Sequence, residues 1–287
     1  GYDRVDSDTD FFAGLVTAKR IQNNVRAFVS ETWELPASHL TFNVGLQAID
    51  HEFSGFDLQP SARASWSPPG AGNFWASASR AVRTPSLEEE LYGSGTLDSE
   101  SVVAFEAGWR GKLAGGVSLD LALYQNDYDD VRVRSFDPVT FLDTYSNSAS
   151  GSSKGVELGI DIKAADWWTL RSAYSYHISE HTSDGLDFAL DEVDGQYPVH
   201  MLNLRSYIDV ADNWEVDAAA YLVERFESHP TGGDGPEYWR GDVRLGWTPN
   251  ENVRVSLGVQ GFNDPSRSEF GSAEVRRQVF LSLDLTR

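Results

Sequence analysis

Cysteine is absent from this sequence of 287 residues, so the chain has no disulfide and no thiolate metal ligand. Basic residues are also scarce: 23 Lys and Arg stand against 44 Asp and Glu, which gives a formal net charge of −21. Nucleic acids are held through their phosphates by Lys and Arg, and anionic lipid surfaces attract the same residues. The composition therefore predicts no nucleic-acid partner.

Long apolar runs are missing too. A membrane helix needs about 18 to 20 consecutive apolar residues, and the longest candidate here is the short stretch from Ala218 to Val223. The mean hydropathy is −0.38. A membrane β-strand faces lipid with only every second residue, so its average hydropathy can be polar. The sequence thus argues against spanning helices and leaves a membrane β-barrel open.

Alternation of apolar and polar residues is what the sequence has in abundance. One run places Val253, Val255, Leu257 and Val259 on one face and Arg254, Ser256, Gly258 and Gln260 on the other. The residues before it, 248–252, are of types that favour a tight reversal, and a similar run precedes them. A period of two indicates β-strands with one apolar and one polar face.

Similar runs recur along the whole chain. We predict fourteen strands, at 9–20, 24–35, 39–51, 57–67, 72–84, 99–111, 115–132, 153–165, 167–181, 197–210, 212–226, 237–248, 252–263 and 274–286. Most exceed the length of about 5 to 6 residues that is usual in globular proteins, whereas a strand that crosses a membrane needs about 9 to 11. The lengths favour an all-β fold, an antiparallel transmembrane β-barrel.

The predicted connections alternate between short and long. Short ones lie at 36–38, 67–72, 111–114, 166, 211 and 248–252, and long polar ones at 85–98, 134–152, 182–196, 227–236 and 263–273. Eight of the nine Trp lie within a few residues of a short turn, and only Trp239 lies at the long-loop end. Short periplasmic turns, long extracellular loops and an aromatic girdle are typical of outer-membrane barrels.

Several motifs follow one another in an order that points to one family. They are residues 74–91 (FWASASRAVRTPSLEEEL), 97–100 with 105–110 (LDSE and FEAGWR), 123–130 (LYQNDYDD), 154–158 (KGVEL) and the pair 25–35 and 40–51. Together they resemble the barrel of TonB-dependent outer-membrane receptors over essentially the whole chain. The resemblance implies a single domain, residues 1–287, that forms the C-terminal part of a barrel of about 22 strands. The plug domain and the TonB-contacting segment of the family are not in the sequence.

The resemblance also implies a function. We expect a receptor and transporter in the outer membrane of a Gram-negative bacterium that takes up a scarce nutrient such as a ferric siderophore. Uptake in the family is coupled to TonB through the plug. Expected partners are outer-membrane lipid, a small-molecule ligand such as a metal chelate, and lipopolysaccharide, which divalent ions would bridge to the acidic residues of 182–196. Neither enzymatic activity nor a bound cofactor is expected.

Candidate ligand contacts are Tyr and Arg residues beside the two central long loops, because these residue types often anchor recognition surfaces. They are Arg83, Tyr92, Tyr128, Arg132, Arg134 and Tyr145. A second set of charged residues is expected to face the lumen and to pair across neighbouring strands. This set is Asp120, Glu157, Asp161, Glu215, Asp217, Arg240, Asp242, Arg244 and Arg254.

Two further patterns are weaker. Residues 151–155 match the G-x-S-x-G motif, but a nucleophile elbow needs a strand that turns into a helix, and here a loop enters a strand. Five of the six histidines, at 51, 177, 181, 200 and 229, fall toward the long-loop rim. They could contact haem or a metal complex, although no metal-ligand spacing is present and polar loops contain histidine by default. We predict neither a catalytic residue nor a metal site.

Three other readings stay open from the sequence. The chain could be a complete fourteen-stranded passive channel or porin, because an even number of strands can close on itself. An outer-membrane enzyme would need a Ser/His/acid constellation at the rim, and none is seen. A soluble β-sheet protein would show the same alternation over any one hairpin.

Overall fold

A computed structural model describes residues 2–11, 16–86, 89–90, 97–137, 142–183, 197–226, 235–264, 266–270 and 273–285. Fourteen strands form one antiparallel sheet in chain order, β1 to β13 followed by β16. Their bounds are β1 Tyr2–Phe11, β2 Val16–Leu35, β3 Leu40–His51, β4 Gly55–Trp66, β5 Asn73–Arg83, β6 Glu100–Lys112, β7 Val117–Asp137, β8 Leu142–Ala165, β9 Trp168–Ser183, β10 His200–Ala211, β11 Trp214–Val223, β12 Tyr238–Asn250, β13 Val253–Gln260 and β16 Gln278–Leu285. The predicted antiparallel all-β fold is confirmed.

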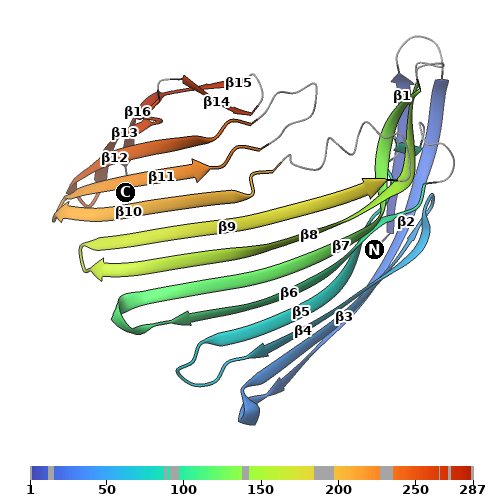
Figure 1. The fold of residues 1–287 in the computed structure, drawn as a ribbon, viewed down its shortest axis with the longest axis horizontal. Helices are drawn as coiled ribbons and strands as arrows, with labels where there is room; N and C mark the ends of the chain where they lie inside the picture. The colour runs from blue at the N-terminus through green and yellow to red at the C-terminus, as the bar shows by residue number, and fades with distance from the viewer. Residues whose placement is uncertain are drawn as a thin grey trace.

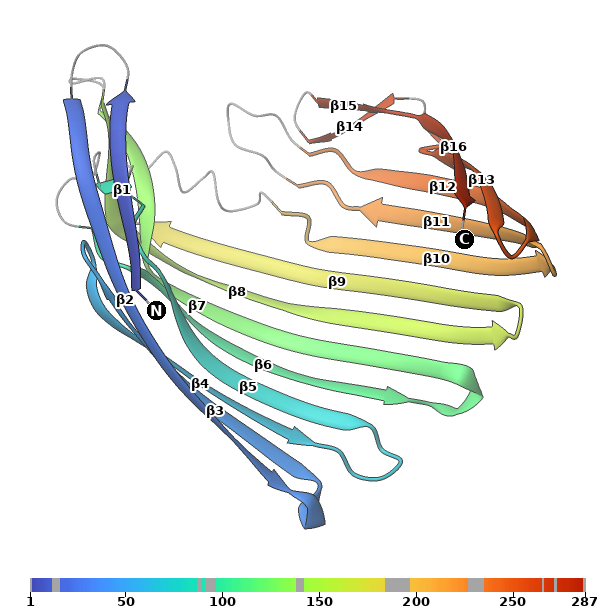
Figure 2. The same ribbon diagram turned by 180° about the vertical axis from the view of Figure 1, so that it is seen from behind.

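The sheet curves into a trough that is open on one side (Figures 1 and 2). Its terminal strands do not pair with each other among the described residues, because the strand order ends at β1 and at β16. β1 pairs with residues 16–25 of β2 only, so residues 26–35 of β2 have a partner on one side, β3. The described sheet is therefore a wall with two free edges. It is not a closed barrel.

Compact turns join the strands at one rim of the trough. Two of them are single 3-10 turns, Pro36–Ser38 and Ala114–Gly116, and the second requires glycine because Gly115 and Gly116 have φ of 75° and 76°. Aromatic rings surround this rim: Trp214 stacks on Trp247 at 5.8 Å, and Trp167 stacks on Trp168 at 5.9 Å. The predicted girdle is thus an interacting set of rings at one end of the wall.

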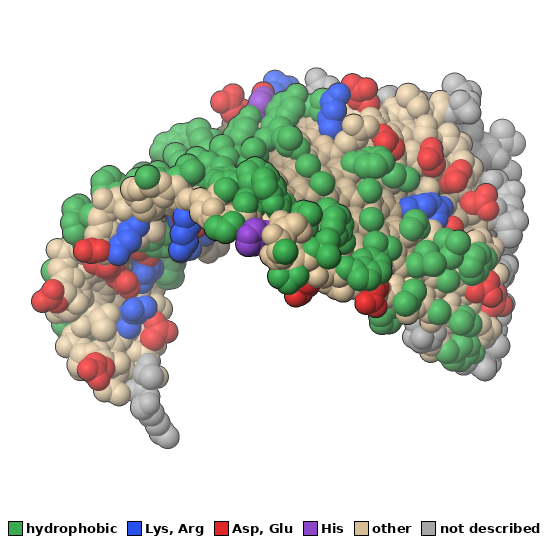
Figure 3. All heavy atoms as spheres, turned by 90° about the horizontal axis from the view of Figure 1, so that it is seen from below, with side chains coloured by type: hydrophobic (Ala, Val, Ile, Leu, Met, Phe, Trp, Pro, Cys, Tyr) green, Lys and Arg blue, Asp and Glu red, His purple; other side chains and the backbone are tan. Residues whose placement is uncertain are grey.

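The register separates two faces along every strand. On the convex face, Val243 is opposite both Ala218 and Val259, and Leu257 is opposite both Leu245 and Leu281. The predicted lumenal set lies on the concave face. Figure 3 shows the sheet as an arch, with hydrophobic side chains spread along its back and charged side chains inside the hollow. Leu257 and Leu281 are 49% and 74% exposed, so none of the described segments covers the apolar face at these residues.

Three predicted boundaries are wrong. The predicted strand 9–20 combines the end of β1 with the start of β2, and β2 continues through residues 21–23, where we placed a break. The predicted loop 134–152 is largely a continuation of the β7–β8 hairpin, in which Arg134 is opposite Tyr145. The predicted loop 263–273 contains a small separate hairpin, β14 Ser266–Phe270 with β15 Ala273–Arg276. In each case, pairing with a neighbouring segment outweighed the local turn composition.

Buried side chains are few, as expected for a single layer, and most of them gather at the long-loop ends of β2 to β8. They include Asn24, Ile49, His51, Glu89, Leu97, Ser99, Val133 and Ala149. This small core lies at the long-loop rim, which is opposite the compact turns and is called the outer rim below, and it holds the loops against the sheet. No helix within the described ranges is long and apolar enough to cross a membrane.

Candidate ligand-binding rim

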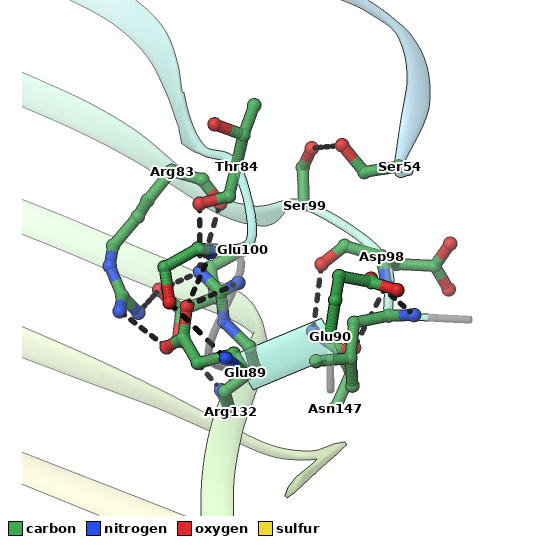
Figure 4. A network of polar contacts seen from close by, with 12 residues as sticks. Ser54, Arg83, Thr84, Glu89, Glu90, Asp98, Ser99, Glu100, Arg132 and Asn147 are labelled. Atoms are coloured by element: carbon green, nitrogen blue, oxygen red, sulfur yellow. Dashed lines mark hydrogen bonds and ion pairs between the residues drawn. The ribbon is translucent and has the colours of Figure 1, made fainter. Parts of the chain in front are cut away.

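Two arginines and two glutamates form an ionic cluster at the outer rim (Figure 4). Arg83 ends β5 and binds two carboxylates: its Nη1 lies 2.6 Å from Glu100 Oε2, and its Nη2 lies 2.6 Å from Glu89 Oε1. Arg132 of β7 reaches the same two groups, with Nη2 at 3.1 Å from Glu100 Oε2 and Nη1 at 3.3 Å from Glu89 Oε2. Each carboxylate is therefore shared by two guanidinium groups. We call these four residues the rim cluster.

The local sequence explains how Glu89 reaches this position. Pro85 is the second residue after the end of β5 and cannot donate a ladder hydrogen bond. Ser86 and Glu89 then form a capping box: the Ser86 backbone N–H donates to Glu89 Oε2 at 2.7 Å, and the Glu89 N–H donates to Ser86 Oγ at 3.3 Å. The turn that results directs the Glu89 carboxylate back to Arg83 and Arg132.

Arg132 is the most enclosed member of the rim cluster, with a side chain 1% exposed. Its Nη2 also donates to the backbone carbonyls of Arg83 and Thr84, at 3.1 and 3.4 Å. Its backbone N–H donates to Glu100 Oε1 at 2.8 Å. This side chain thus joins β7, the end of β5 and the start of β6 at one point.

The two carboxyl groups are held in the ionised state. Burial raises the pKa of Glu89, but the hydrogen bonds from Ser86 and the charges of Arg132 and Arg83 outweigh it, and the pKa lies below its usual value. The pKa of Glu100 is also lowered, because the hydrogen bonds from Arg132 and Arg83 outweigh the effect of burial. The rim cluster therefore keeps its charge pairs at neutral pH.

A second set of contacts ties three neighbouring loops together. Ser99 Oγ donates to Ser54 Oγ of the β3–β4 turn at 2.8 Å. The Asp98 N–H donates to Asn147 Oδ1 at 2.9 Å, and Asn147 Nδ2 donates back to the Asp98 carbonyl at 3.1 Å and to that of Asp130 at 2.6 Å. Because Asn147 belongs to β8 and Asp130 to β7, the β5–β6 segment is fastened to both neighbours.

His51 is the buried partner of the β3–β4 turn. The backbone N–H groups of Phe53 and Ser54 both donate to its Nδ1 at 3.3 Å, so that nitrogen carries no proton. Its Nε2 lies 2.6 Å from the side-chain amide of Gln22. Burial, and next the charge of Arg26, lower the pKa of His51, so the ring is neutral. This histidine has a structural role in the turn.

The structure brings some of the predicted ligand contacts together and separates others. Arg83 and Arg132 share the rim cluster. Tyr128 lies on the concave face, with its hydroxyl 3.2 Å from Ser153 Oγ. Arg134 and Tyr145 are opposite each other in the upper part of the β7–β8 hairpin. Tyr92, His229 and the acidic residues of 184–194 lie outside the described residues.

Sequence reasoning missed Glu89, Glu100 and Asn147. The S-x-x-E spacing of Ser86 and Glu89 is a capping-box signature and is the one signal that could have located Glu89. Ser153 of the G-x-S-x-G motif is buried within β8, where Asn126 Nδ2 donates to its hydroxyl at 3.1 Å. Among the described residues, no three His, Cys, Asp or Glu side chains converge as a metal site would require.

Below the rim, charged side chains of the concave wall form ion pairs, several of them across neighbouring strands as predicted. Arg244 is the clearest case: its Nε donates to Asp217 Oδ2 at 2.7 Å, and its Nη1 donates to Glu215 Oε1 at 2.9 Å and to Ser256 Oγ at 3.0 Å. Arg110 with Asp120 and Arg171 with Asp161 also join neighbouring strands. Arg240 pairs with Asp242 within β12, and Arg254 of β13 pairs with Glu215 of β11. The hollow is therefore lined by charged and polar side chains.

Comparison with known proteins agrees with this architecture. The siderophore receptor PirA of Acinetobacter baumannii shares the fold with a TM-score of 0.79 and 16% identity, over 99% of this chain and 50% of that one. A mutant of the ferric enterobactin receptor PfeA of Pseudomonas aeruginosa gives a TM-score of 0.76 and 15% identity, over 99% of this chain and 49% of that one. The siderophore receptor PirA of Pseudomonas aeruginosa gives a TM-score of 0.71 and 20% identity, over 93% of this chain and 47% of that one.

The chain therefore spans about half the length of these receptors. At identities of this size the likeness shows the fold alone. The family itself is shown by sequence: the family described as "TonB dependent receptor-like, beta-barrel" matches residues 1–261. Together with the sheet and its two unequal rims, this match shows that the chain belongs to the TonB-dependent receptor β-barrel family.

Proposed function

We propose that the chain forms the wall and outer rim of an outer-membrane receptor that takes up a scarce nutrient such as a ferric siderophore. TonB-dependent receptors are outer-membrane transporters of Gram-negative bacteria and are not enzymes. In the proposed arrangement the convex apolar face contacts lipid and the short turns face the periplasm. TonB would act through a plug domain, and lipopolysaccharide would surround the outer rim.

The observation that carries this proposal is the contrast between the two rims of one wall. The compact-turn rim carries the aromatic girdle, whereas the opposite rim carries loops fastened to one another by the rim cluster and Asn147. An ordered outer rim above a polar hollow suits solute capture followed by passage. Ligand contact by Arg83, Tyr92, Tyr128, Arg134 and Tyr145 remains a prediction. For Arg132, the burial favours a positioning role.

The alternative of a complete fourteen-stranded passive channel is less well supported. Such a channel needs the first and last strands to pair, and the described sheet has two free edges instead. Unpaired backbone groups cost several kcal/mol each in hydrocarbon. A barrel completed by further strands removes this cost.

Iron-limited growth tests the proposal. A strain that lacks the gene should take up at least one radiolabelled ferric siderophore more slowly than its parent, and removal of TonB should cause the same loss. Steady ion conductance of the purified protein in a planar bilayer, together with unchanged uptake in the deletion strain, would favour the passive channel.

A further inference from the structure

Two tyrosine–histidine pairs lie side by side on the concave face of β7, β8 and β9. The hydroxyl of Tyr124 lies 2.6 Å from His177 Nδ1. Four residues further along each strand, the rings of Tyr128 and His181 have centroids 5.9 Å apart. Side chains two or four residues apart on a strand share a face, so both pairs face the hollow, on the same face as Glu157. None of these four side chains takes part in the rim cluster.

A glycine of β8 lies beneath each pair. Gly155 is opposite Tyr124 on one side and His177 on the other. A Cβ at this position would lie 2.4 Å from the hydroxyl oxygen of Tyr124 and 2.3 Å from the carbonyl oxygen of Tyr176. The bare backbone therefore lets the phenol extend across β8 to the imidazole on β9.

The second pair is built in the same way. Gly151 is opposite both Tyr128 and His181, and a Cβ there would lie 2.4 Å from the His181 ring. Each row is thus Tyr–Gly–His across three strands, and its rings lie along the wall.

The hydroxyl groups of both tyrosines have partners within the wall. Tyr124 is paired with His177, and the Tyr128 hydroxyl contacts Ser153 Oγ at 3.2 Å. The Tyr124 and His177 rings are nearly parallel, at 27°, and Tyr197 meets His177 edge-on at 86°. What the rows offer to the hollow is therefore mainly ring surface.

A shared metal ion does not explain the rows. His177 and His181 are four residues apart on one strand, a separation of about 13 Å along it. That distance is several times the length of a metal–nitrogen bond, about 2 Å. A planar aromatic group fits better, because aromatic rings attract one another in offset-stacked and edge-to-face arrangements.

We propose that the two Tyr–Gly–His rows form a stacking platform for planar aromatic rings of a solute that enters the hollow. This inference rests on the proposed receptor function and narrows its ligand to chelates that carry aromatic rings. A chelate built only from aliphatic groups gains nothing from the platform.

The test uses catechol and its ferric complex as aromatic probes, with acetohydroxamate and its ferric complex as probes that lack a ring. Binding to the purified protein in detergent micelles is measured by saturation-transfer NMR. We expect a Tyr124→Leu/Tyr128→Leu double variant to bind the aromatic probes roughly tenfold more weakly, the loss expected for about one stacked ring. Binding of the hydroxamate probes should not change.

Two matched variants make the result specific. Tyr124→Phe/Tyr128→Phe keeps the rings and should keep the affinity for catechol. Tyr174→Leu removes a tyrosine whose hydroxyl also contacts a histidine, His200 Nδ1 at 2.7 Å, but on the convex face. It should have no effect. The inference is overturned if catechol does not contact the wild-type protein, or if the Tyr174 variant loses as much affinity as the double variant.

Failure of the receptor function would be seen separately. If catechol binds the platform while cells take up no ferric complex through the protein, the stacking platform stands and the transport proposal fails.

Discussion

Arg132 illustrates how a charged residue can be both buried and structural. Its guanidinium is enclosed between Glu89 and Glu100 and also donates to two backbone carbonyls of the β5 end. Removing one partner of a buried ion pair leaves the other charge without compensation, which costs more than the pair itself contributes. The rim cluster is therefore sensitive to loss of this one side chain.

We expect Arg132→Met to lower the free energy of unfolding by about 3 kcal/mol, because two buried carboxylates lose a shared cation. The matched control is Arg110→Met, whose side chain is 75% exposed and pairs with Asp120. That change should cost less than about 1 kcal/mol. Urea unfolding followed by tryptophan fluorescence measures both. An equal decrease in the free energy of unfolding for the two variants would show that the burial of Arg132 does not increase its contribution to stability.

The pKa values of Glu89 and Glu100 predict an acid-sensitive rim. Both are lowered from the model-compound value of 4.5, so the folded state favours the ionised carboxylates. Their contribution to stability is complete above pH 4.5 and is lost as the pH falls through the lowered values. The urea concentration at the midpoint of unfolding should therefore decrease as the pH is lowered below 4.5. In a Glu89→Gln/Glu100→Gln variant this part of the pH dependence should be absent, and an unchanged slope would contradict the assignment.

At the scale of single strands, the face on which a residue lies and its position along the strand decide how much a charged substitution there destabilises the protein. Leu257 of β13 lies between Leu245 and Leu281 on the convex face and is near the middle of its strand. Arg254 is on the opposite face, beside Glu215 at 3.7 Å. Leu257 and Arg254 are three positions apart on the same strand, so their side chains point to opposite faces of the sheet.

Leu257→Lys should destabilise the protein in lipid vesicles by about 2 to 4 kcal/mol, since an ammonium group would enter the hydrocarbon region. Val255→Lys should cost less, because Val255 is opposite the girdle residue Trp247, nearer the membrane surface. Arg254→Gln is the inward control and should cost least. Folding titrations in vesicles would rank the three, and a larger loss for Arg254→Gln would reverse the assignment of faces.

The strands could be predicted from the sequence wherever one face is apolar and the other is polar. Val253 to Val259 alternate in this way, and the register confirms both faces. The rim differs, because the positions of Glu89 and Asn147 depend on partners distant in sequence. Asn147 contacts Asp98, which is 49 residues away. The extension of β7 and β8 beyond residue 134 also escaped prediction, because its composition is typical of a loop and its strand structure depends on the pairing of the two segments.

At the scale of the whole molecule, the proposed orientation gives each rim a different environment. The absence of cysteine makes this measurable, because any introduced thiol is the sole one in the chain. Thr182 is an exposed residue near the long-loop end of β9, and Asp166 is an exposed residue of the β8–β9 turn.

On intact cells, a bulky polyethylene-glycol maleimide should label Thr182→Cys and should label Asp166→Cys only after the outer membrane is permeabilised. The physical reason is that the reagent cannot cross the membrane to the periplasmic rim. Labelling of Asp166→Cys on intact cells would invert the proposed orientation.

The free edges of β2 and β16 also have a consequence for how the protein folds. Hairpin pairings along the wall join segments close in sequence, and such contacts form early because their loops are short. The edge along residues 26–35 of β2 and the edge of β16 lie at opposite ends of the strand order. Any strand that joins these two edges makes the most distant contacts of the barrel. Closure should therefore be the slow step, and the wall should enter lipid only as its last backbone groups find partners.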